Sequence, residues 1–201
     1  MKIGWLLGWS IPEAWFAPLA RAAFPSAAHT WIPAEPDALD RLAAAGPFDW
    51  LAGYSLGALL LLSEAERAAR LGRVALLAPI FAFPTEAGLG GRIPRTQVRY
   101  LARQLRRDPV AARADFYARA GLDAPAGGPA ASLENLLWGL DRLETAAVAP
   151  RIPAGWAAWC GAEDALLDAA RLHELAPEVR VVPGATHHPD ALLRAFAADA
   201  K

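Results

Sequence analysis

The sequence predicts an α/β fold with a mostly parallel sheet, helices on both faces and one helical insert. Short apolar runs alternate with helix-forming segments, and the short links between them favour a parallel sheet. The alternation stops after the fourth expected strand and resumes roughly 65 residues later, which is too long for an ordinary loop. With 201 residues, of which 55% are hydrophobic and 20% charged, the chain has the size and composition of one globular domain.

Four strands are expected in the first part of the chain. Each is an apolar run with little polar alternation, as is typical of strands buried on both faces. They cover residues 3–7, 28–32, 48–54 and 73–78. Segments rich in alanine and leucine favour helices over 14–24, over 37–45 and from the third strand to about residue 71.

The insert is expected over about residues 82–149, where no strand pattern is visible. Helix-forming segments cover 94–107, 111–120 and 133–143, and a loop containing Gly127, Gly128 and Pro129 precedes the last of them. We interpret this insert as a helical lid. The alternation then resumes with strands at 154–160 and 179–182 and with helices over 166–175 and from 187 onward.

A possible nucleophile lies between the third strand and the helix that follows it. The run Gly53-Tyr54-Ser55-Leu56-Gly57 fits the pattern Gly-x-Ser-x-Gly at a sharp turn from strand to helix. Small neighbours suit a strained serine that other backbone approaches closely, and the helix N-terminus favours negative charge beside the hydroxyl. The alternative is a glycine and serine turn that merely starts a helix.

A base and an orienting acid follow later strands. A serine hydroxyl is too weakly acidic to attack unaided, and His187, just after the last strand, is the candidate base. His188 is its rival, and the pair could instead only begin a surface helix. Asp164, after the strand that ends near Cys160, is the candidate acid, and its alternative role is a helix cap. Glu163 and Asp168 compete with it.

Two backbone N–H groups are expected to bind an oxyanion. One belongs to Leu56, directly after the serine, and the other to Trp9, in the loop after the first strand. The Trp9 ring could alternatively serve packing alone. Because ligands bind at the carboxyl ends of parallel strands, all these groups are expected at one edge of the sheet.

Composition excludes several other classes of protein. The net charge of −1 gives no global sign of nucleic-acid binding, and the single Cys160 excludes an internal disulfide and argues against structural zinc. No secretory signal is visible, and no apolar run reaches the roughly 18 residues of a membrane span. We expect a cytoplasmic protein without a membrane anchor, metal or organic cofactor.

Basic side chains are concentrated in the insert. Residues 92–119 contain eight arginines against Asp108 and Asp115, a net charge of +6 in a chain whose net charge is −1. Helical spacing places several of them on one face, namely Arg95, Arg99, Arg103 and Arg106 or Arg107. Such a stripe can steer an acidic partner, or it can simply be the solvated face of an amphipathic helix. No aromatic interleaving supports nucleic acid as the partner.

These motifs together resemble the α/β-hydrolase family over nearly the whole chain. The order Ser55, Asp164, His187 carries the resemblance, with Leu7-Gly8-Trp9-Ser10 and Gly184-Ala185-Thr186-His187 around it. Within that family the chain is most similar to the esterases that cleave the methyl ester of pimeloyl-acyl carrier protein in biotin synthesis. The family often has histidine where Leu7 stands, and the esterases often have tryptophan where Tyr54 stands. The usual first hairpin of the sheet is absent.

The resemblance implies a nucleophile at Ser55, a base at His187, an orienter at Asp164 and oxyanion donors at Trp9 and Leu56. It also implies an acyl substrate on an acidic acyl carrier protein, held by the insert arginines. Two alternatives stay open. One is a generic carboxylesterase or thioesterase for small acyl substrates, and the other is a binding protein of the same fold without catalytic activity.

Overall fold

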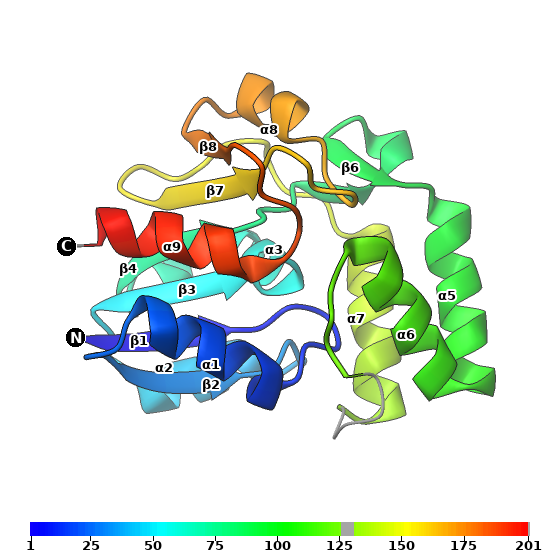
Figure 1. Cartoon of the computed structure of the whole chain (residues 1–201), viewed down its shortest axis with the longest axis horizontal. Helices are drawn as coiled ribbons and strands as arrows, with labels where there is room; N and C mark the ends of the chain where they lie inside the picture. The colour runs from blue at the N-terminus through cyan, green and yellow to red at the C-terminus, as the bar shows by residue number, and fades with distance from the viewer. Residues whose placement is uncertain (126–130, 201) are drawn as a thin grey trace.

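The structure is a computed structural model that describes residues 1–125 and 131–200. Within these residues, six strands form one sheet in the order β2-β1-β3-β4-β7-β8, and every neighbouring pair is parallel (Figure 1). The strands are β1 (Lys2–Leu6), β2 (Ala28–Ile32), β3 (Trp50–Tyr54), β4 (Arg73–Leu77), β7 (Ala157–Gly161) and β8 (Val179–Val182). The predicted α/β fold with a mostly parallel sheet is confirmed.

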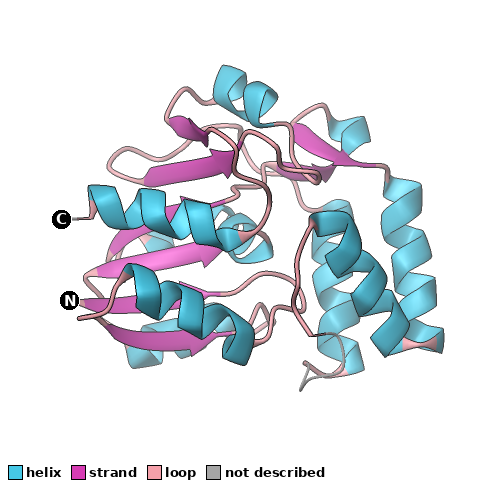
Figure 2. Cartoon of the chain, in the orientation of Figure 1, coloured by secondary structure: helices cyan, strands magenta, loops and turns pink. Residues whose placement is uncertain are grey.

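Helices cover both faces of the sheet, which explains why its central strands are apolar without alternation. Helices α1 (Glu13–Ala23) and α9 (Pro189–Asp199) pack together on the face turned to the viewer, and α2 (Ala38–Ala45) and α3 (Leu56–Ser63) lie behind it (Figures 1 and 2). Every residue of β3 is buried as a result, whereas the edge strands β2 and β8 are partly exposed.

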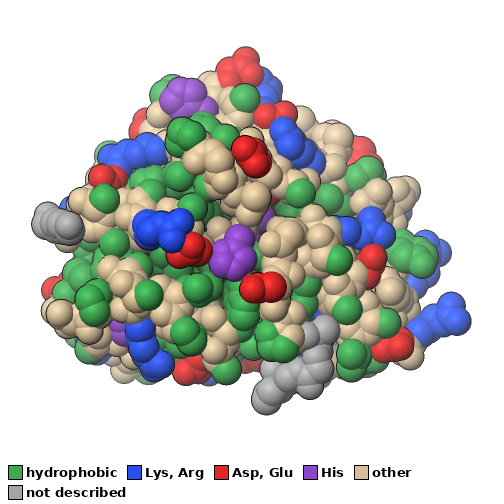
Figure 3. Space-filling view, viewed as in Figure 1, with side chains coloured by type: hydrophobic (Ala, Val, Ile, Leu, Met, Phe, Trp, Pro, Cys, Tyr) green, Lys and Arg blue, Asp and Glu red, His purple; other side chains and the backbone are tan. Residues whose placement is uncertain are grey.

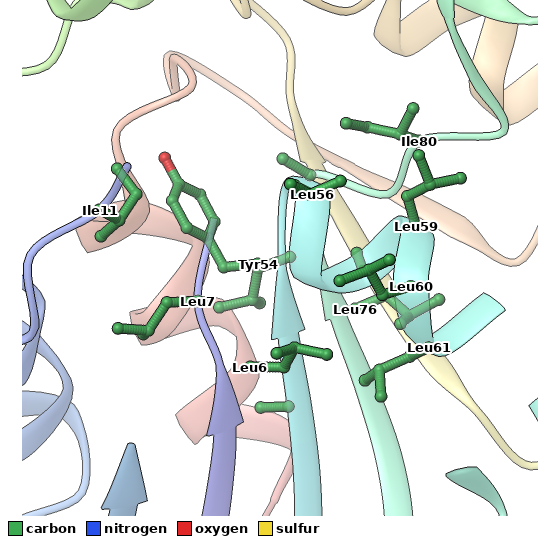
Figure 4. Packing of buried hydrophobic residues seen from close by; sticks show 14 of the residues in the cluster. Leu6, Leu7, Ile11, Tyr54, Leu56, Leu59, Leu60, Leu61, Leu76 and Ile80 are labelled. Carbon is green, nitrogen blue, oxygen red and sulfur yellow. The ribbon is translucent and has the colours of Figure 1, made fainter. Parts of the chain in front are cut away.

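The two faces of the sheet are packed with different side chains. On the side of α9, aromatic rings gather around Phe196, with Trp50 at 5.0 Å and Trp159 at 5.4 Å between ring centroids. On the side of α3, leucines fill the space between helix and sheet, among them Leu59 and Leu61 (Figure 4). Because α3 is apolar all round, it is buried on every side and fixes the turn that precedes it.

The insert lies at one end of the molecule beside the carboxyl ends of the strands (Figure 1). It contains β5 (Ala82–Pro84), the 3-10 helix η1 (Thr85–Ala87), β6 (Gly90–Ile93), α5 (Arg95–Arg107), α6 (Pro109–Ala120) and α7 (Leu133–Thr145). Helix α5 packs against both α6 and α7, and α7 also contacts β5. The predicted loop through Gly127, Gly128 and Pro129 lies outside the described residues.

The expectation of an insert without strands is wrong. Strands β5 and β6 pair in parallel as a small separate sheet. Both are short, and one contains proline while the other contains two glycines, so neither shows a side-chain pattern. Gly91 is required there, because a Cβ at this position would lie 1.9 Å from the carbonyl oxygen of Phe83.

Several predicted boundaries are also corrected. Strand β3 begins at Trp50 rather than Phe48, and β7 begins at Ala157, which leaves Trp156 outside the sheet. The helix after the serine breaks at Glu64, and a short helix α4 (Ala65–Ala68) follows. Helix α8 (Ala169–Leu175) begins three residues later than expected. Among the described residues, no helix combines the length and the apolar character that crossing a membrane requires.

Candidate active site

Ser55 occupies the tip of a strained turn between β3 and α3. Its backbone has φ 55° and ψ −115°, a conformation that residues other than glycine rarely adopt. Hydrogen bonds hold it there, since the Ser55 N–H donates to the Leu77 carbonyl at 2.9 Å and the Leu59 N–H donates to the Ser55 carbonyl at 3.1 Å. Such strain persists only where the surroundings impose it, as they do here.

The glycines on both sides of Ser55 are sterically required. A Cβ at Gly53 would lie 2.9 Å from the backbone of Ala58, and a Cβ at Gly57 would lie 2.1 Å from the Leu6 carbonyl oxygen. The turn therefore packs directly against its own helix and against the end of β1. An ordinary turn that only starts a helix makes no such demand, so the geometry favours a turn built to present the serine.

Three of the predicted side chains form one hydrogen-bonded chain. The Ser55 Oγ lies 3.0 Å from His187 Nε2, and His187 Nδ1 lies 2.7 Å from Asp164 Oδ2. All three side chains are buried, with exposures of 5%, 1% and 0% for Ser55, His187 and Asp164. With its proton on Nδ1 facing the carboxylate, the imidazole presents a free Nε2 that can accept the serine proton.

The carboxylate of Asp164 is held in place by its own loop. Its Oδ1 accepts the backbone N–H groups of Leu166 at 2.8 Å and Leu167 at 3.0 Å, which leaves Oδ2 for the imidazole. Arg92 donates to the Asp164 carbonyl at 3.0 Å and so ties the insert to this loop. A buried carboxylate with three hydrogen bonds is well suited to orient an imidazole.

The rival acids lie elsewhere. Asp168 is the residue that caps α8, since its side chain accepts the Arg171 N–H at 3.1 Å. The helix-cap role considered for Asp164 therefore belongs to Asp168. The Glu163 side chain is exposed, and its backbone N–H donates to the Ala185 carbonyl at 2.8 Å. Neither side chain has a hydrogen bond to His187 among the described residues.

The two adjacent histidines have different surroundings. His188 caps α9, with its Nδ1 accepting the Asp190 N–H at 3.3 Å, so the helix-start role belongs to this residue. The backbone of His187 is fixed by Tyr54, whose hydroxyl donates to the His187 carbonyl at 2.8 Å. Burial and the nearby Asp164 charge raise the pKa of Tyr54 well above its usual value, so the phenol stays a neutral donor.

The predicted oxyanion donors lie at the same end of the sheet. Leu56 is the first residue of α3, where helix geometry leaves N–H groups without a partner in the helix. The loop that carries Trp9 packs on the turn, since a Cβ at Gly8 would lie 3.2 Å from the Ser55 Cβ. Within the described residues, neither the Trp9 nor the Leu56 N–H has a hydrogen-bond acceptor. The carbonyl oxygen of a substrate that Ser55 has attacked could therefore accept a hydrogen bond from each of these N–H groups.

The Trp9 side chain also has a packing role, which was the alternative considered for this residue. It lies buried against Phe116 of α6, with 4.8 Å between ring centroids, and its Nε1 donates to the Leu136 carbonyl of α7 at 2.8 Å. Helix α7 crosses directly above it, because a Cβ at Gly139 would lie 2.6 Å from the Trp9 ring and 3.2 Å from Leu56. Two helices of the insert thus cover the predicted donors.

A mainly apolar cavity of about 170 Å³ lies within the insert. Phe83, Phe116 and Leu166 contribute to its wall, together with apolar side chains of α5 and α7. The polar side chains in the lining are Gln97, Tyr100, Asp115 and Arg119. Phe116 is the residue that packs on Trp9, and Leu166 belongs to the loop of Asp164. The cavity therefore shares walls with the oxyanion loop and with the acid loop. These residues could not be identified from the sequence, because a single apolar residue in a strand, helix or loop carries no functional signal of its own.

The predicted arginine stripe divides over two surfaces of α5. A groove of about 540 Å³ between α5 and α7 is lined by Arg99, Arg103 and Arg106, but Asp141 and Glu144 line it too. Arg99 is bonded to Glu144, with 2.6 Å between Nε and Oε1. Basic side chains project where α5 lies, with acidic side chains among them (Figure 3).

Two of the predicted arginines lie away from that groove. Arg107 faces a second depression, shared with Tyr100 and Asp108. Arg95 begins α5, and its backbone N–H donates to the Glu86 carboxylate at 3.0 Å. In residues 1–125 and 131–200, no three histidine, cysteine, aspartate or glutamate side chains gather where they could hold a metal ion.

Comparison with known proteins identifies the fold. No protein-family model and no curated protein matches the chain. Among solved structures, an esterase from Exiguobacterium antarcticum matches with a TM-score of 0.69 and 12% identity, covering 100% of this chain and 91% of that one. A thioesterase of prodiginine biosynthesis from Streptomyces coelicolor matches with a TM-score of 0.60 and 17% identity, covering 98% and 89%.

A third structure bears the family name itself. MGS-M2, an α/β hydrolase from a Medee basin deep-sea metagenome, matches with a TM-score of 0.58 and 13% identity, covering 99% of this chain and 87% of that one. At such low identity these matches show the architecture and leave the substrate open. The chain has the α/β-hydrolase fold.

Proposed function

We propose that this protein is a serine hydrolase that cleaves carboxylic esters. The observation that carries the proposal is the buried chain from Ser55 Oγ through His187 to Asp164, with contacts of 3.0 and 2.7 Å at the tip of a strained turn. Similarity of fold to an esterase and a thioesterase supports the same class of reaction. A binding protein without catalytic activity has no need for a strained serine with a paired base.

The proposed reaction has two halves. His187 Nε2 takes the Ser55 proton while Oγ attacks the ester carbonyl, and the N–H groups of Trp9 and Leu56 hold the oxyanion. The C–O bond to the alcohol then breaks, and His187 returns its proton to the leaving oxygen. Water, deprotonated by the same imidazole, attacks the acyl-enzyme and releases the acid. Asp164 keeps the imidazole in the required tautomer throughout.

The cavity within the insert is the proposed site of the acyl chain. Most of its lining is apolar, and it borders both the oxyanion loop, through Phe116, and the acid loop at Leu166. Apolar cavities with a few polar groups are the usual form of small-molecule sites. An acyl group bound there would extend from Ser55 under α7 toward α5. Longer acyl chains are therefore expected to lower KM until they fill the cavity.

The finer proposal is that the substrate is the methyl ester of a pimeloyl chain on acyl carrier protein. The motifs around Ser55 and His187 resemble the esterases of biotin synthesis, and α5 adds a concentration of positive charge. Arg103, Arg106 and Arg107 have no acidic partner among the described residues, whereas Arg99 is paired with Glu144. The three are thus available to an acidic carrier protein, which electrostatic attraction would steer to α5.

Hydrolysis of p-nitrophenyl esters with acyl chains of increasing length tests the reaction class. Wild type is expected to turn over these esters, and Ser55→Ala is expected to lose at least about 10³-fold in kcat because the nucleophile is gone. Equal rates for wild type and Ser55→Ala, with both proteins folded, would remove the serine-hydrolase proposal.

Charge reversal on α5 tests the carrier. Changing Arg103, Arg106 and Arg107 to glutamate is expected to lower kcat/KM on the carrier-bound methyl ester at least about tenfold and on p-nitrophenyl esters less than about twofold. Reversal of Arg70, Arg151 and Arg194 matches the change in net charge at exposed positions outside α5 and serves as the control. Equal losses on both substrates would leave a generic esterase, and complementation of a strain without the pimeloyl ester esterase tests the pathway.

A further inference from the structure

One lid arginine is buried instead of exposed. Arg113 of α6, one of the eight arginines in residues 92–119, is only 3% exposed. Its Nε donates to the Ser10 Oγ at 2.7 Å, and its Nη2 donates to the Tyr117 hydroxyl at 3.3 Å. Tyr117 lies one turn further along α6 and is also buried. A buried guanidinium ion destabilises the fold unless hydrogen bonds or opposite charges compensate for the hydration it loses.

Tyr117 completes the network around Ser10. Its hydroxyl donates to the Ser10 backbone carbonyl and lies 3.0 Å from the Ser10 Oγ. Both the side chain and the backbone of Ser10 are therefore bonded to α6. No other residue of the oxyanion loop has two such side chains directed at it among the described residues.

Ser10 adopts a backbone conformation that favours glycine. Its φ is 61°, and the Ile11 N–H donates to the Gly8 carbonyl at 3.3 Å across the turn. Trp9 and Ser10 are thus the central residues of a β-turn whose second position has a positive φ, where serine is disfavoured. The bonds from Arg113 and Tyr117 offset this preference and hold the turn in its observed form.

The same turn carries the predicted oxyanion donor. The Trp9 N–H belongs to the residue before Ser10, and the Trp9 side chain is fixed separately by its 2.8 Å bond to Leu136 of α7. If Ser10 were released, the turn could relax to a conformation that serine prefers. Trp9 would then move relative to Ser55, even though no atom of the reacting chain had been changed.

We propose that Arg113 and Tyr117 are positioning residues that aim the Trp9 N–H at the oxyanion by holding Ser10. The inference rests on the proposed role of Ser55 and extends it, because it gives helix α6 of the insert a part in positioning the catalytic groups. An oxyanion exists in the transition state and not in the bound ester, so the contribution falls on kcat and not on KM.

Three variants and a transition-state analogue test this. Tyr117→Phe, Arg113→Met and Arg113→Lys are assayed on a p-nitrophenyl ester, together with the Ki of an alkyl trifluoromethyl ketone, which forms a tetrahedral adduct with the serine. For Tyr117→Phe and Arg113→Met we expect kcat to fall about 10- to 100-fold, KM to change less than threefold, and the Ki to rise in parallel with the fall in kcat. Arg113→Lys keeps the charge and is expected to recover part of the loss.

Two controls separate positioning from stability. Leu105→Ala loosens the packing of α5 without touching Ser10, and Arg41→Met removes a partly exposed arginine far from the insert. Neither is expected to shift the analogue Ki more than threefold. In a Ser10→Gly background, Tyr117→Phe is expected to cost less, because glycine adopts the positive φ without support.

The outcomes distinguish this inference from the function on which it rests. If wild type is active and Tyr117→Phe keeps the full kcat, or changes only in having a higher KM, the positioning role is overturned and the serine-hydrolase proposal stands. The same loss in Leu105→Ala as in Tyr117→Phe would also overturn it, since general loosening would then suffice. Wild type that neither hydrolyses esters nor binds the ketone would overturn both proposals together.

Discussion

The role of Asp164 can be tested by changing one atom. In Asp164→Asn the Oδ1 atom can keep both backbone bonds, from Leu166 at 2.8 Å and Leu167 at 3.0 Å. These bonds fix which way the new amide points, so its NH₂ group takes the place of Oδ2, 2.7 Å from His187 Nδ1. An NH₂ group donates, so Nδ1 must accept and the imidazole proton moves to Nε2. That nitrogen can then no longer accept the proton of Ser55.

The expected loss in kcat is about 10⁴-fold, the size found when a triad imidazole is held in the wrong tautomer. At about 1.36 kcal/mol for each factor of ten, this is about 5 kcal/mol of transition-state stabilisation. The fold is expected to survive, because the side chains are nearly isosteric and a buried charge is removed. We expect the free energy of unfolding to change by less than about 2 kcal/mol.

Steady-state kinetics on a p-nitrophenyl ester, with urea unfolding of the same samples, measures both effects. Asp168→Asn is the matched control, because Asp168 competes with Asp164 in the sequence but caps α8. Asparagine caps helices as well as aspartate does, so kcat and stability should both stay near the wild-type values. Folded Asp164→Asn with more than a tenth of wild-type kcat, or a larger loss in Asp168→Asn, would refute the reasoning.

Three further predictions concern the turn, the thiol and a partly buried histidine. Gly57→Ala is expected to destabilise the fold by about 3 kcal/mol in urea unfolding and to lower kcat, because the new Cβ would lie 2.1 Å from the Leu6 carbonyl oxygen; wild-type stability would contradict this. Burial raises the pKa of the Cys160 thiol, so iodoacetamide at pH 8 should alkylate it only in urea, and rapid labelling of folded protein would be the contrary result. Partial burial lowers the pKa of His29, whose Nδ1 accepts the Trp5 indole N–H at 2.9 Å; the unfolded state therefore binds more protons below about pH 6.5, and stability should fall on acidification by less in His29→Gln than in wild type, whereas an equal fall in both would contradict this.

The parallel sheet and the approximate position of the site could be predicted because each rests on local patterns. Apolar runs without alternation identify strands buried on both faces, and the pattern around Ser55 combines a required pair of glycines with the step from strand to helix. The carboxyl ends of parallel strands meet at one edge, so Asp164 and His187 were expected beside Ser55. Each of these inferences needs only the sequence near the residue and the rule of the fold.

The features that sequence analysis missed depend on contacts between distant segments. Strands β5 and β6 pair through backbone that Gly91 allows to approach, which leaves no side-chain pattern to recognise. Arg113 is one of eight arginines in residues 92–119 and nothing in the sequence near it sets it apart, so only the packing of α6 on the oxyanion loop reveals its burial. Gly139 offered one signal, because a glycine within a helix often marks a place where another segment packs closely. The sequence does not indicate that this segment is the loop of Trp9.

The central claim is that a buried imidazole makes one serine hydroxyl reactive, and covalent labelling tests it most directly. Folded wild type is treated with a fluorophosphonate, digested and analysed by mass spectrometry, with His187→Ala and Ser55→Ala in parallel. We predict one adduct, on the peptide that contains Ser55, which His187→Ala slows at least about 10³-fold and Ser55→Ala abolishes. Folded wild type without an adduct on Ser55, or an equal rate in His187→Ala, would contradict the account.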